Sequence, residues 1–326
     1  MLRWNSLDAV PPGYGPSVVT LGNFDGVHRG HRVVLERVVG LARSRGAHAV
    51  AVTFDPHPVA VLHPERAPVR LTGLDHRLEL MATTGLDAVL VMPFTRELAR
   101  QTPEEFVRRT FVDGLGAVAV VVGVDTRFGV HNSGDIETMR ALSRELGFDV
   151  VALDPVGDEP DGADRAAQRP RSWSSTRLRG ALAAGEVAVA AEVLGRPHRV
   201  SGTVVHGHHR GRGLGFPTAN LGPGAEGMVP ADGVYAGWLE RLDLPPGDPD
   251  RRMPAAISVG TNPTFDDVPE RTVEAHVLDR TDLDLYGERV GVEFAEWLRG
   301  NVRFDSVEDL LRQMHRDVDA SRALLG

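Results

Sequence analysis

The sequence predicts two domains of different class, a doubly wound parallel α/β domain followed by a smaller all-β domain that ends in a helix. Up to about residue 153, apolar runs alternate with helical patterns. After Gly195, short strand candidates follow one another between Gly- and Pro-rich turns. The length of 326 residues also suits two ordinary domains better than one.

Five apolar runs in the first half are expected to be strands. They are rich in Val and Ala without polar alternation, which is typical of strands buried on both faces of a parallel sheet. The runs are Ser17–Gly22, Ala47–Phe54, Leu86–Pro93, Ala117–Gly123 and Phe148–Leu153.

Helical patterns fill the intervals between these strands. One runs from about Gly30 to Arg45 and another from Ser133 to about Leu146. A third starts at Thr102, where Thr102 as N-cap, Pro103 at the first helical position and Glu105 form a predicted capping box.

The polar segment 154–171 is a linker or a loop, and a loop is favoured. The Ser-Ser-Thr sequence at 174–176 begins another helix, to about Ala183, whose residues suit the first domain. A short helix at 186–194 follows, and the domain boundary is placed near residue 184.

The second half has the rhythm of a small β-barrel or sandwich. Its strand candidates are Val200–His206, Gly233–Leu239, Ala255–Gly260, Thr272–Leu278 and Glu288–Phe294. Ser306 is expected to cap a final amphipathic helix that packs against this β-structure. The apolar stripe of that helix is Val307, Leu310, Leu311, Met314 and Val318.

Composition excludes several classes of protein. The net charge of −9 argues against a nucleic-acid or anionic-membrane footprint over the whole chain. The absence of cysteine excludes disulfides, thiolate catalysis and cysteine zinc sites. No run approaches the roughly 18 apolar residues of a membrane span, and the start lacks a signal-peptide pattern, so we expect a cytoplasmic protein. The chain has no lysine, so a phosphate clamp must use Arg, His or backbone N–H groups; we interpret Arg77 as part of this bias.

The first candidate site is the segment 22–31 (GNFDGVHRGH), between the first strand and the first helix. In an open parallel sheet, ligands bind at the carboxyl ends of strands, and a helix N-terminus suits phosphate. His28 and His31 are three residues apart and can both donate hydrogen bonds to an α-phosphate as its charge builds up. The alternative is a tight turn with two surface histidines, which this ten-residue string makes less favoured.

The second candidate site is the Gly-rich basic segment 202–220. Gly207–Gly215 can wrap a polyphosphate with backbone N–H groups. The Thr218 hydroxyl and the Asn220 carbonyl oxygen can hold Mg²⁺. The alternative is a Gly-rich hairpin connection whose Thr218 and Asn220 cap a turn; the Pro-Thr-Ala-Asn sequence favours function.

These strings carry a family resemblance. The HxGH pattern is the signature of nucleotidylyltransferases, and GNFDGVHRGH resembles the FMN adenylyltransferase module of bacterial bifunctional riboflavin kinase/FAD synthetases. The resemblance continues at 52–58 (VTFDPHP), 122–129 (VGVDTRFG) and 174–179 (SSTRLR). The segments 202–220, 233–235, 258–265, 272–276 and 284–287 are similar to the riboflavin kinase module of the same family.

The resemblance implies a Rossmann-like adenylyltransferase domain at 1–184 and a Greek-key barrel kinase domain at 185–326. It implies that Glu274 is the catalytic base of the kinase and that His28 and His31 act in adenylyl transfer. The expected ATP and phosphate contacts are Gly22, Asn23, Phe24, Asp25, Gly30, Ser174, Ser175, Thr176, Arg177, Arg179, Gly207, Arg210, Gly211, Arg212 and Gly215. The expected flavin contacts are Asp55, Pro56, Asp125, Phe216, Asn262 and Thr264, and the expected metal ligands are Thr218 and Asn220.

Several alternatives stay open from the residues alone. Asp55 could be a turn former, and Asn262 and Thr264 could simply form a Pro turn. In strand 272–278, alternation places Thr272, Glu274 and His276 on one face, which faces either solvent or an active site.

The function that the family resemblance implies is the conversion of riboflavin to FMN and of FMN to FAD, with ATP as co-substrate and Mg²⁺ as cofactor. The partners are these small molecules, with no nucleic acid and no membrane, and the protein is a monomer or a transient homo-oligomer. The family often has an aromatic residue at the position of Thr126 and a basic one at Asn132, which motivates a kinase with an impaired adenylyltransferase domain as the alternative. A non-catalytic flavin-binding protein is a further alternative.

Overall fold

The computed structural model describes residues 1–158, 171–206, 215–260 and 271–326. By their internal contacts these residues form two compact units, Met1–Pro68 with Leu74–Ser174, and Val69–Gly73 with Ser175–Gly326. Helix α6 (Ser175–Ala183) thus belongs to the second unit. The boundary near residue 184 stays a prediction.

The first unit is built on a parallel sheet of six strands in the order β1-β4-β3-β2-β5-β6. The bounds are β1 Leu2–Trp4, β2 Ser17–Leu21, β3 His48–Phe54, β4 Ala88–Met92, β5 Ala117–Gly123 and β6 Asp149–Leu153. The five expected strands are therefore present. The sequence analysis missed β1, an edge strand of three residues that pairs with β4.

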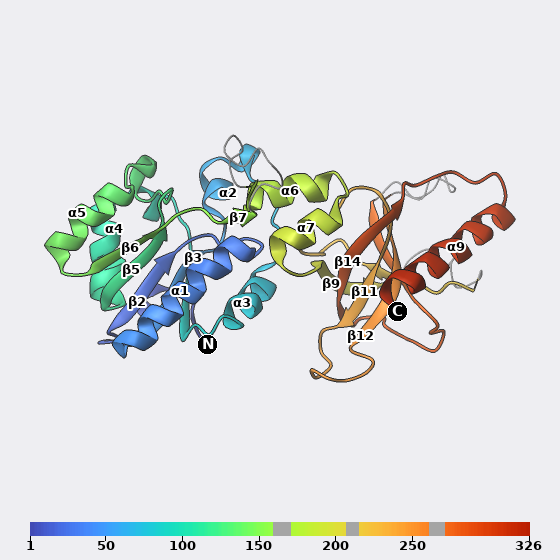
Figure 1. Ribbon diagram of the computed structural model, residues 1–326, viewed down its shortest axis with the longest axis horizontal. Helices are drawn as coiled ribbons and strands as arrows, with labels where there is room; N and C mark the ends of the chain where they lie inside the picture. The colour runs from blue at the N-terminus through green and yellow to red at the C-terminus, as the bar shows by residue number, and fades with distance from the viewer. Residues whose placement is uncertain (159–170, 207–214, 261–270) are drawn as a thin grey trace, which may run out of the picture. The chain divides into compact units, whose positions relative to one another are not determined.

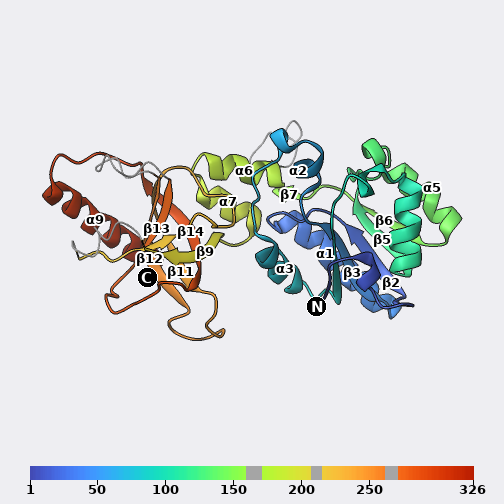
Figure 2. The same ribbon diagram turned by 180° about the vertical axis from the view of Figure 1, so that it is seen from behind.

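Helices cover both faces of this sheet, as Figures 1 and 2 show. The bounds are α1 Arg29–Arg45, α2 Pro58–Leu62, α3 Leu74–Ala82, α4 Pro103–Phe106, the π-helical segment η4 Val107–Gly114, and α5 Ile136–Leu146. One core contains α1 and α3 side chains such as Leu35 and Met81, and the opposite core contains Phe111 and Met139 of η4 and α5. This three-layer arrangement confirms the doubly wound α/β prediction.

Local signals explain where two of these helices begin. Thr102 accepts from the N–H of Glu105 while the Glu105 carboxylate accepts from the N–H of Thr102, so the expected capping box is present. Helix α5 begins later than expected because Asp135, rather than Ser133, is the N-cap and accepts from Thr138 N–H.

Short elements complete the first unit. Strands β7 (Gly157–Asp158) and β8 (Arg171–Ser172) form a two-stranded sheet within the segment expected to be a loop. Single-turn 3₁₀ helices are η1 Leu7–Ala9, η2 Pro64–Arg66, η3 Leu98–Arg100 and η5 Val130–Asn132.

The second unit is a closed six-stranded barrel in the order β10-β13-β12-β11-β14-β9. The bounds are α7 Val187–Leu194, β9 His198–Val205, β10 Ala219–Leu221, β11 Gly233–Arg241, β12 Arg252–Gly260, β13 Thr272–Val277, β14 Arg289–Arg299 and α9 Val307–Leu325. Strands β11, β12 and β13 form a meander, and β14 returns beside β11, which is the Greek-key order. A barrel, not a sandwich, is thus confirmed.

Helix α9 lies against β11 and β12. Ser306 caps it by accepting from Asp309 N–H at 3.1 Å. The expectation for its apolar stripe was partly wrong, because Val307 is 52% exposed and Leu310, Met314 and Val318 line a pocket instead of a closed core. None of the helices in the described ranges is long and apolar enough to cross a membrane.

Candidate active sites

The first candidate site is the turn between β2 and α1. Strand β2 lies between β3 and β5, so the chain winds outward in both directions from this point. Such a switch point opens a crevice at the carboxyl ends of the strands, where α/β proteins bind ligands. Within the turn, Phe24 and Val27 have positive φ angles of 49° and 39°. For a β-branched residue this is a rare conformation, of the kind that clusters at functional sites.

His28 and His31 lie together at the start of α1. Their rings are stacked, with centroids 3.6 Å apart and planes inclined by 20°. His28 is the N-cap, and its Nδ1 accepts from the backbone N–H of His31 at 3.3 Å. A neutral His28 therefore carries its proton on Nε2.

Burial, the neighbouring His28 and then Arg77 lower the pKa of His31 well below its usual value, so its imidazole is neutral near pH 7. Its Nδ1 is buried and has no hydrogen-bond partner among the described residues. A buried imidazole nitrogen in this state is a group that a ligand can complete.

Two glycines of the turn are required by close contacts. A Cβ on Gly22 would lie 3.0 Å from the ring of Phe24, which in turn packs edge-on against His31 at 5.3 Å. A Cβ on Gly30 would lie 2.9 Å from the backbone oxygen of Trp173 and 3.2 Å from the ring of His28. A side chain at Gly22 would therefore shift Phe24, and one at Gly30 would shift either Trp173 or the ring of His28.

Arg77 of α3 is buried and contacts the start of this turn, a role for which the sequence analysis made no prediction. Its buried guanidinium donates from Nη1 to the oxygen of Asn23 at 2.9 Å and from Nη2 to the oxygen of Phe54 at 3.2 Å. Nη2 also lies 3.8 Å from the carboxylate of Asp55. Thr53 donates to the same Asn23 oxygen at 3.1 Å. Arg77 is therefore part of the framework of the site and not only a result of composition.

The other predicted residues of this site lie at neighbouring strand ends. Asp25 is buried in the turn itself. Asp55 is half-buried and Pro56 is exposed directly after β3, and Asp125 is exposed directly after β5. Thr126 follows it and is half-buried. The structure thus brings these residues to one edge of the sheet.

The motif at 174–179 crosses the division between the two units. Ser174 ends the first unit, whereas Ser175, Thr176, Arg177 and Arg179 belong to α6 in the second. Within that unit, Nε of Arg179 donates to the oxygen of Val69 at 2.9 Å. The role of the motif in binding ATP phosphates stays a prediction.

The second candidate site lies where β10 pairs with β13. The register places Asn220 opposite Glu274. The hydroxyl of Thr218 donates to Oε2 of Glu274 at 3.3 Å, and the side-chain amide of Asn220 donates to Oγ1 of Thr218 at 3.2 Å. Thr272 donates to the other Glu274 oxygen at 3.3 Å. The strongest motif of the sequence and the predicted base therefore form one cluster of oxygen-bearing side chains.

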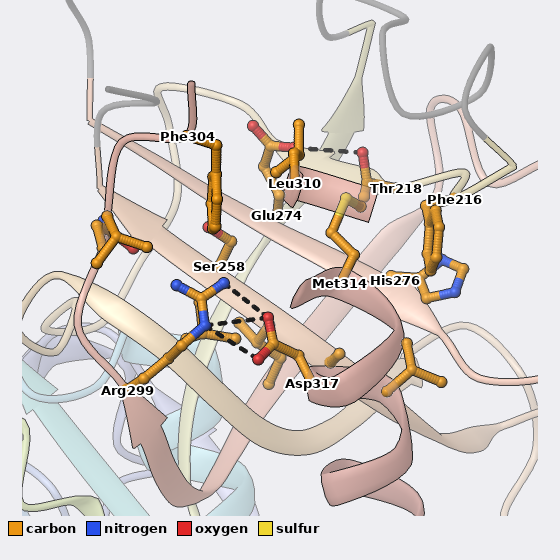
Figure 3. Close-up of a pocket in the computed structure, with 16 residues that line it drawn as sticks. Phe216, Thr218, Ser258, Glu274, His276, Arg299, Phe304, Leu310, Met314 and Asp317 are labelled. Carbon is orange, nitrogen blue, oxygen red and sulfur yellow. Dashed lines mark hydrogen bonds and ion pairs between the residues drawn. The ribbon is translucent and has the colours of Figure 1, made fainter. Parts of the chain in front are cut away.

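A pocket beside this cluster lies between the barrel and α9 (Figure 3). It holds about 800 Å³ of atom-free space, part of which is open to solvent. Glu274 and Thr218 lie at one end, and Leu310 and Met314 of α9 form an apolar wall. The sequence analysis left undecided whether the polar face of β13 meets solvent or an active site. In the structure, Glu274 and His276 of this face line a pocket.

Phe216 and His276 form another part of the pocket wall. Phe216 is buried, and its ring lies 5.2 Å from that of His276. Nδ1 of His276 lies 2.8 Å from the oxygen of Pro217. Burial lowers the pKa of His276, so this ring is neutral near pH 7 and its Nδ1–H donates to that carbonyl. Phe216, a predicted flavin contact, therefore lines the pocket and packs beside His276.

An ion pair connects β14 to α9 at the edge of the pocket. Arg299 contacts Asp317 through Nε and Nη2, and Gln313 donates to the same carboxylate at 2.9 Å. The amphipathic pattern of the helix gave no signal for this pair, because an acidic residue on a helix usually faces solvent.

Several predicted residues lie outside the described ones, namely Gly207, Arg210, Gly211, Arg212, Asn262 and Thr264. Gly215 is described and exposed, with a φ of 86°. Asn132 of the first unit is exposed and also has a positive φ, 56°. In the part of the chain that the structure describes, no group of three or more His, Asp or Glu side chains could hold a metal ion.

Comparison with known proteins assigns both halves of the chain. The family model for FAD synthetase matches residues 12–164, and the model for riboflavin kinase matches residues 194–325. The bifunctional riboflavin kinase/FMN adenylyltransferase of Escherichia coli K12 is 36% identical over 309 residues, which cover 95% of this chain and 93% of that protein. The chain belongs to the bifunctional riboflavin kinase/FMN adenylyltransferase family.

Two further comparisons also cover nearly the whole chain. The enzyme of that name from Pseudomonas fluorescens is 37% identical over 96% of this chain and 94% of its own length. A crystal structure described as a macrolide-efflux protein from Streptococcus pneumoniae has a TM-score of 0.82 and 30% identity, with 98% of each chain covered. The resemblance found in the motifs is thus confirmed over nearly the whole chain.

Proposed function

We propose that this chain phosphorylates riboflavin to FMN in its second unit and transfers an adenylyl group from ATP to FMN in its first, giving FAD and pyrophosphate. The observation that carries the proposal is the hydrogen-bonded chain from Asn220 to Thr218 and from Thr218 to Glu274, beside the pocket. Family membership over both halves supports the pairing of the two activities.

In the kinase reaction, Glu274 is the proposed general base. The 5′-hydroxyl of riboflavin must lose its proton as it attacks the γ-phosphate of ATP, and a carboxylate beside the pocket can accept that proton. The apolar wall from α9 suits the flavin ring, while Phe216 packs at the pocket edge. The pocket therefore offers an apolar surface on one side and the base on the other.

Mg²⁺ fits the donor set at this site. Thr218 and Asn220 offer a hydroxyl and an amide oxygen, and Mg²⁺ prefers a few protein oxygens together with nucleotide phosphates. When bound, the metal neutralises charge on the phosphates of ATP. Thr218 and Asn220 are the side chains that would hold it.

In adenylyl transfer, His28 and His31 are proposed to act as hydrogen-bond donors. A phosphate oxygen of FMN attacks the α-phosphate of ATP, the bond to the β-phosphate oxygen breaks, and pyrophosphate leaves. The two imidazoles stabilise the negative charge that builds up on the α-phosphate. No covalent enzyme intermediate is involved.

An incubation of the purified chain with riboflavin, ATP and MgCl₂, followed by HPLC, tests the whole proposal. We expect FMN to appear first and FAD to follow. If the incubation with riboflavin gives FMN but no FAD, and a second incubation that starts from FMN also gives no FAD, the first unit is not an adenylyltransferase. If neither flavin product forms, the chain is not an enzyme of this pathway and the proposal is wrong.

The partners proposed are riboflavin, FMN and ATP, and the location proposed is the cytoplasm. Family membership over both halves supports the small-molecule partners, and the lack of cysteine fits the location. Sedimentation velocity would test the expected monomer or transient oligomer.

A further inference from the structure

Arg77 joins the ends of two neighbouring strands. The carbonyl oxygen of Asn23 follows β2 and that of Phe54 ends β3, and both accept from the same guanidinium. Hydrogen bonds from a charged donor are stronger than neutral ones, and the two nitrogens of the guanidinium fix both direction and spacing. Arg77 therefore extends the link between the two strands beyond their last backbone hydrogen bond, from Gly22 N–H to the oxygen of Val52, and it acts there together with Thr53, which donates to the same Asn23 oxygen.

The two strand ends carry the two halves of the first site. Asn23 leads into the turn whose Phe24 packs against His31, and Phe54 leads into Asp55, which lies 3.8 Å from Arg77. The turn is also strained, with positive φ at Phe24 and Val27, so it needs outside contacts to hold its conformation.

We propose that Arg77 is a positioning residue for adenylyl transfer, which holds the histidine turn and the Asp55 segment at the separation that the reaction requires. The inference rests on the proposed adenylyltransferase function. Arg77 does not touch the reacting atoms in this proposal. It acts through the backbone of Asn23 and Phe54, and its positive charge also faces His31.

The test compares Arg77→Met and Arg77→Lys with Arg43→Met. Arg43 is a matched control, because it also binds a carboxylate and a carbonyl, Asp87 at 2.7 Å and Gly85 at 3.2 Å, but on the exposed surface before β4. Rates of FAD formation from FMN are measured per folded molecule, with the folded fraction of the first unit taken from urea unfolding. Riboflavin kinase activity of the same chain is the internal control.

We expect Arg77→Met to lower kcat for FAD formation by about 100-fold, because a displacement of about 1 Å in a site costs this much. The KM for ATP should change less than threefold, since the N-terminus of α1 remains. Arg77→Lys keeps the charge but not the paired geometry, so we expect kcat to fall by about tenfold. Arg43→Met and all kinase rates should stay within twofold of the wild type.

The inference is overturned if Arg77→Met keeps kcat within threefold, or if its loss of rate only follows its loss of folded protein. If Arg77→Met does not fold, Arg77→Lys decides. A folded lysine variant with at least a fivefold lower kcat supports the inference, and one with an unchanged kcat overturns it. Absence of FAD formation in the wild type would instead reject the proposed function, so the two failures are distinguishable.

Discussion

Arg299 donates from Nε and Nη2 to both carboxylate oxygens of Asp317, at 2.7 to 3.2 Å, and so joins the last barrel strand to the C-terminal helix. The carboxylate is 9% exposed, and both residues line the pocket. Because α9 also supplies Leu310 and Met314 to that pocket, this pair fixes the position of one of its walls.

Asp317→Asn should therefore weaken both the second unit and its kinase activity. Loss of the carboxylate charge leaves Arg299 largely buried without its counter-ion, which costs about 3 kcal/mol of unfolding free energy. We also expect a KM for riboflavin at least fivefold higher. Urea unfolding and steady-state kinetics measure the two effects.

Asp319→Asn is the matched control for this change. Asp319 lies on the same helix, is 74% exposed and pairs with Arg322 at 2.8 Å. Exposed pairs contribute at most about 1 kcal/mol. Equal effects of the two substitutions would contradict a role of the Arg299–Asp317 pair in the pocket.

Gly30→Ala should reduce FAD formation without affecting FMN formation. The added methyl group meets the oxygen of Trp173 at 2.9 Å and must displace either that segment or the ring of His28. We expect at least a tenfold fall in the rate of FAD formation, measured by HPLC with FMN supplied.

Gly40→Ala on the same helix provides the comparison. Its added Cβ meets nothing within 4 Å, and alanine is the better helix former by about 1 kcal/mol. This variant should keep full activity and unfold at a slightly higher urea concentration. A similar loss of activity in both variants would show that helix α1, and not the contact at Gly30, is responsible.

Glu274→Gln and His31→Ala should each remove a different one of the two activities. Glu274→Gln keeps the shape of the side chain but removes the base, so FMN formation should fall by a factor of about 10² to 10⁴. FAD formation from supplied FMN should continue. His31→Ala should abolish FAD formation and leave FMN formation unchanged.

Glu296→Gln, at an exposed position of β14, is the control for the carboxylate and should change neither rate. HPLC of separate incubations with riboflavin and with FMN gives all four rates. The assignments would be wrong if both Glu274→Gln and His31→Ala kept both activities.

The stability of the first unit should fall as the pH drops below about 6.5. The folded pKa of His31 is lower than its unfolded value, because of burial, then His28, then Arg77. In the window below the unfolded pKa, the unfolded chain binds the proton and the folded chain does not, so the free energy of unfolding rises with pH and decreases on acidification.

His31→Gln should reduce the dependence of the unfolding free energy of the first unit on pH. Thermal unfolding of the first unit between pH 7.5 and pH 5 measures it, and the wild type should lose more stability than the variant over that range. If the two proteins respond alike, His31 does not supply the acid sensitivity of this unit.

Much of this fold could be predicted from local patterns. Buried parallel strands such as Ala117–Gly123 appear as continuous apolar runs, and glycine-rich turns mark their ends. The cluster of Thr218 and Glu274 could be expected from the family motif, although the residues are 56 positions apart.

Other features could not be predicted, because their partners are not visible in a sequence. Arg77 binds two backbone carbonyls, at Asn23 and Phe54, and any residue type can supply a carbonyl. Asp317 lies on the buried side of its helix only because Arg299 is opposite. Strand β1 has three residues, too few for a pattern to emerge.

His28 serves two purposes with its two ring nitrogens. Nδ1 holds the first turn of α1 by accepting from the N–H of His31, which leaves Nε2 as the atom that can approach a substrate. A proton or an alkyl group on Nδ1 would end the helix cap as well as changing the ring's charge. Chemical modification at Nδ1 would therefore remove one hydrogen bond from the start of the helix, so a loss of activity after such treatment would report on the shape of the turn as well as on the altered ring.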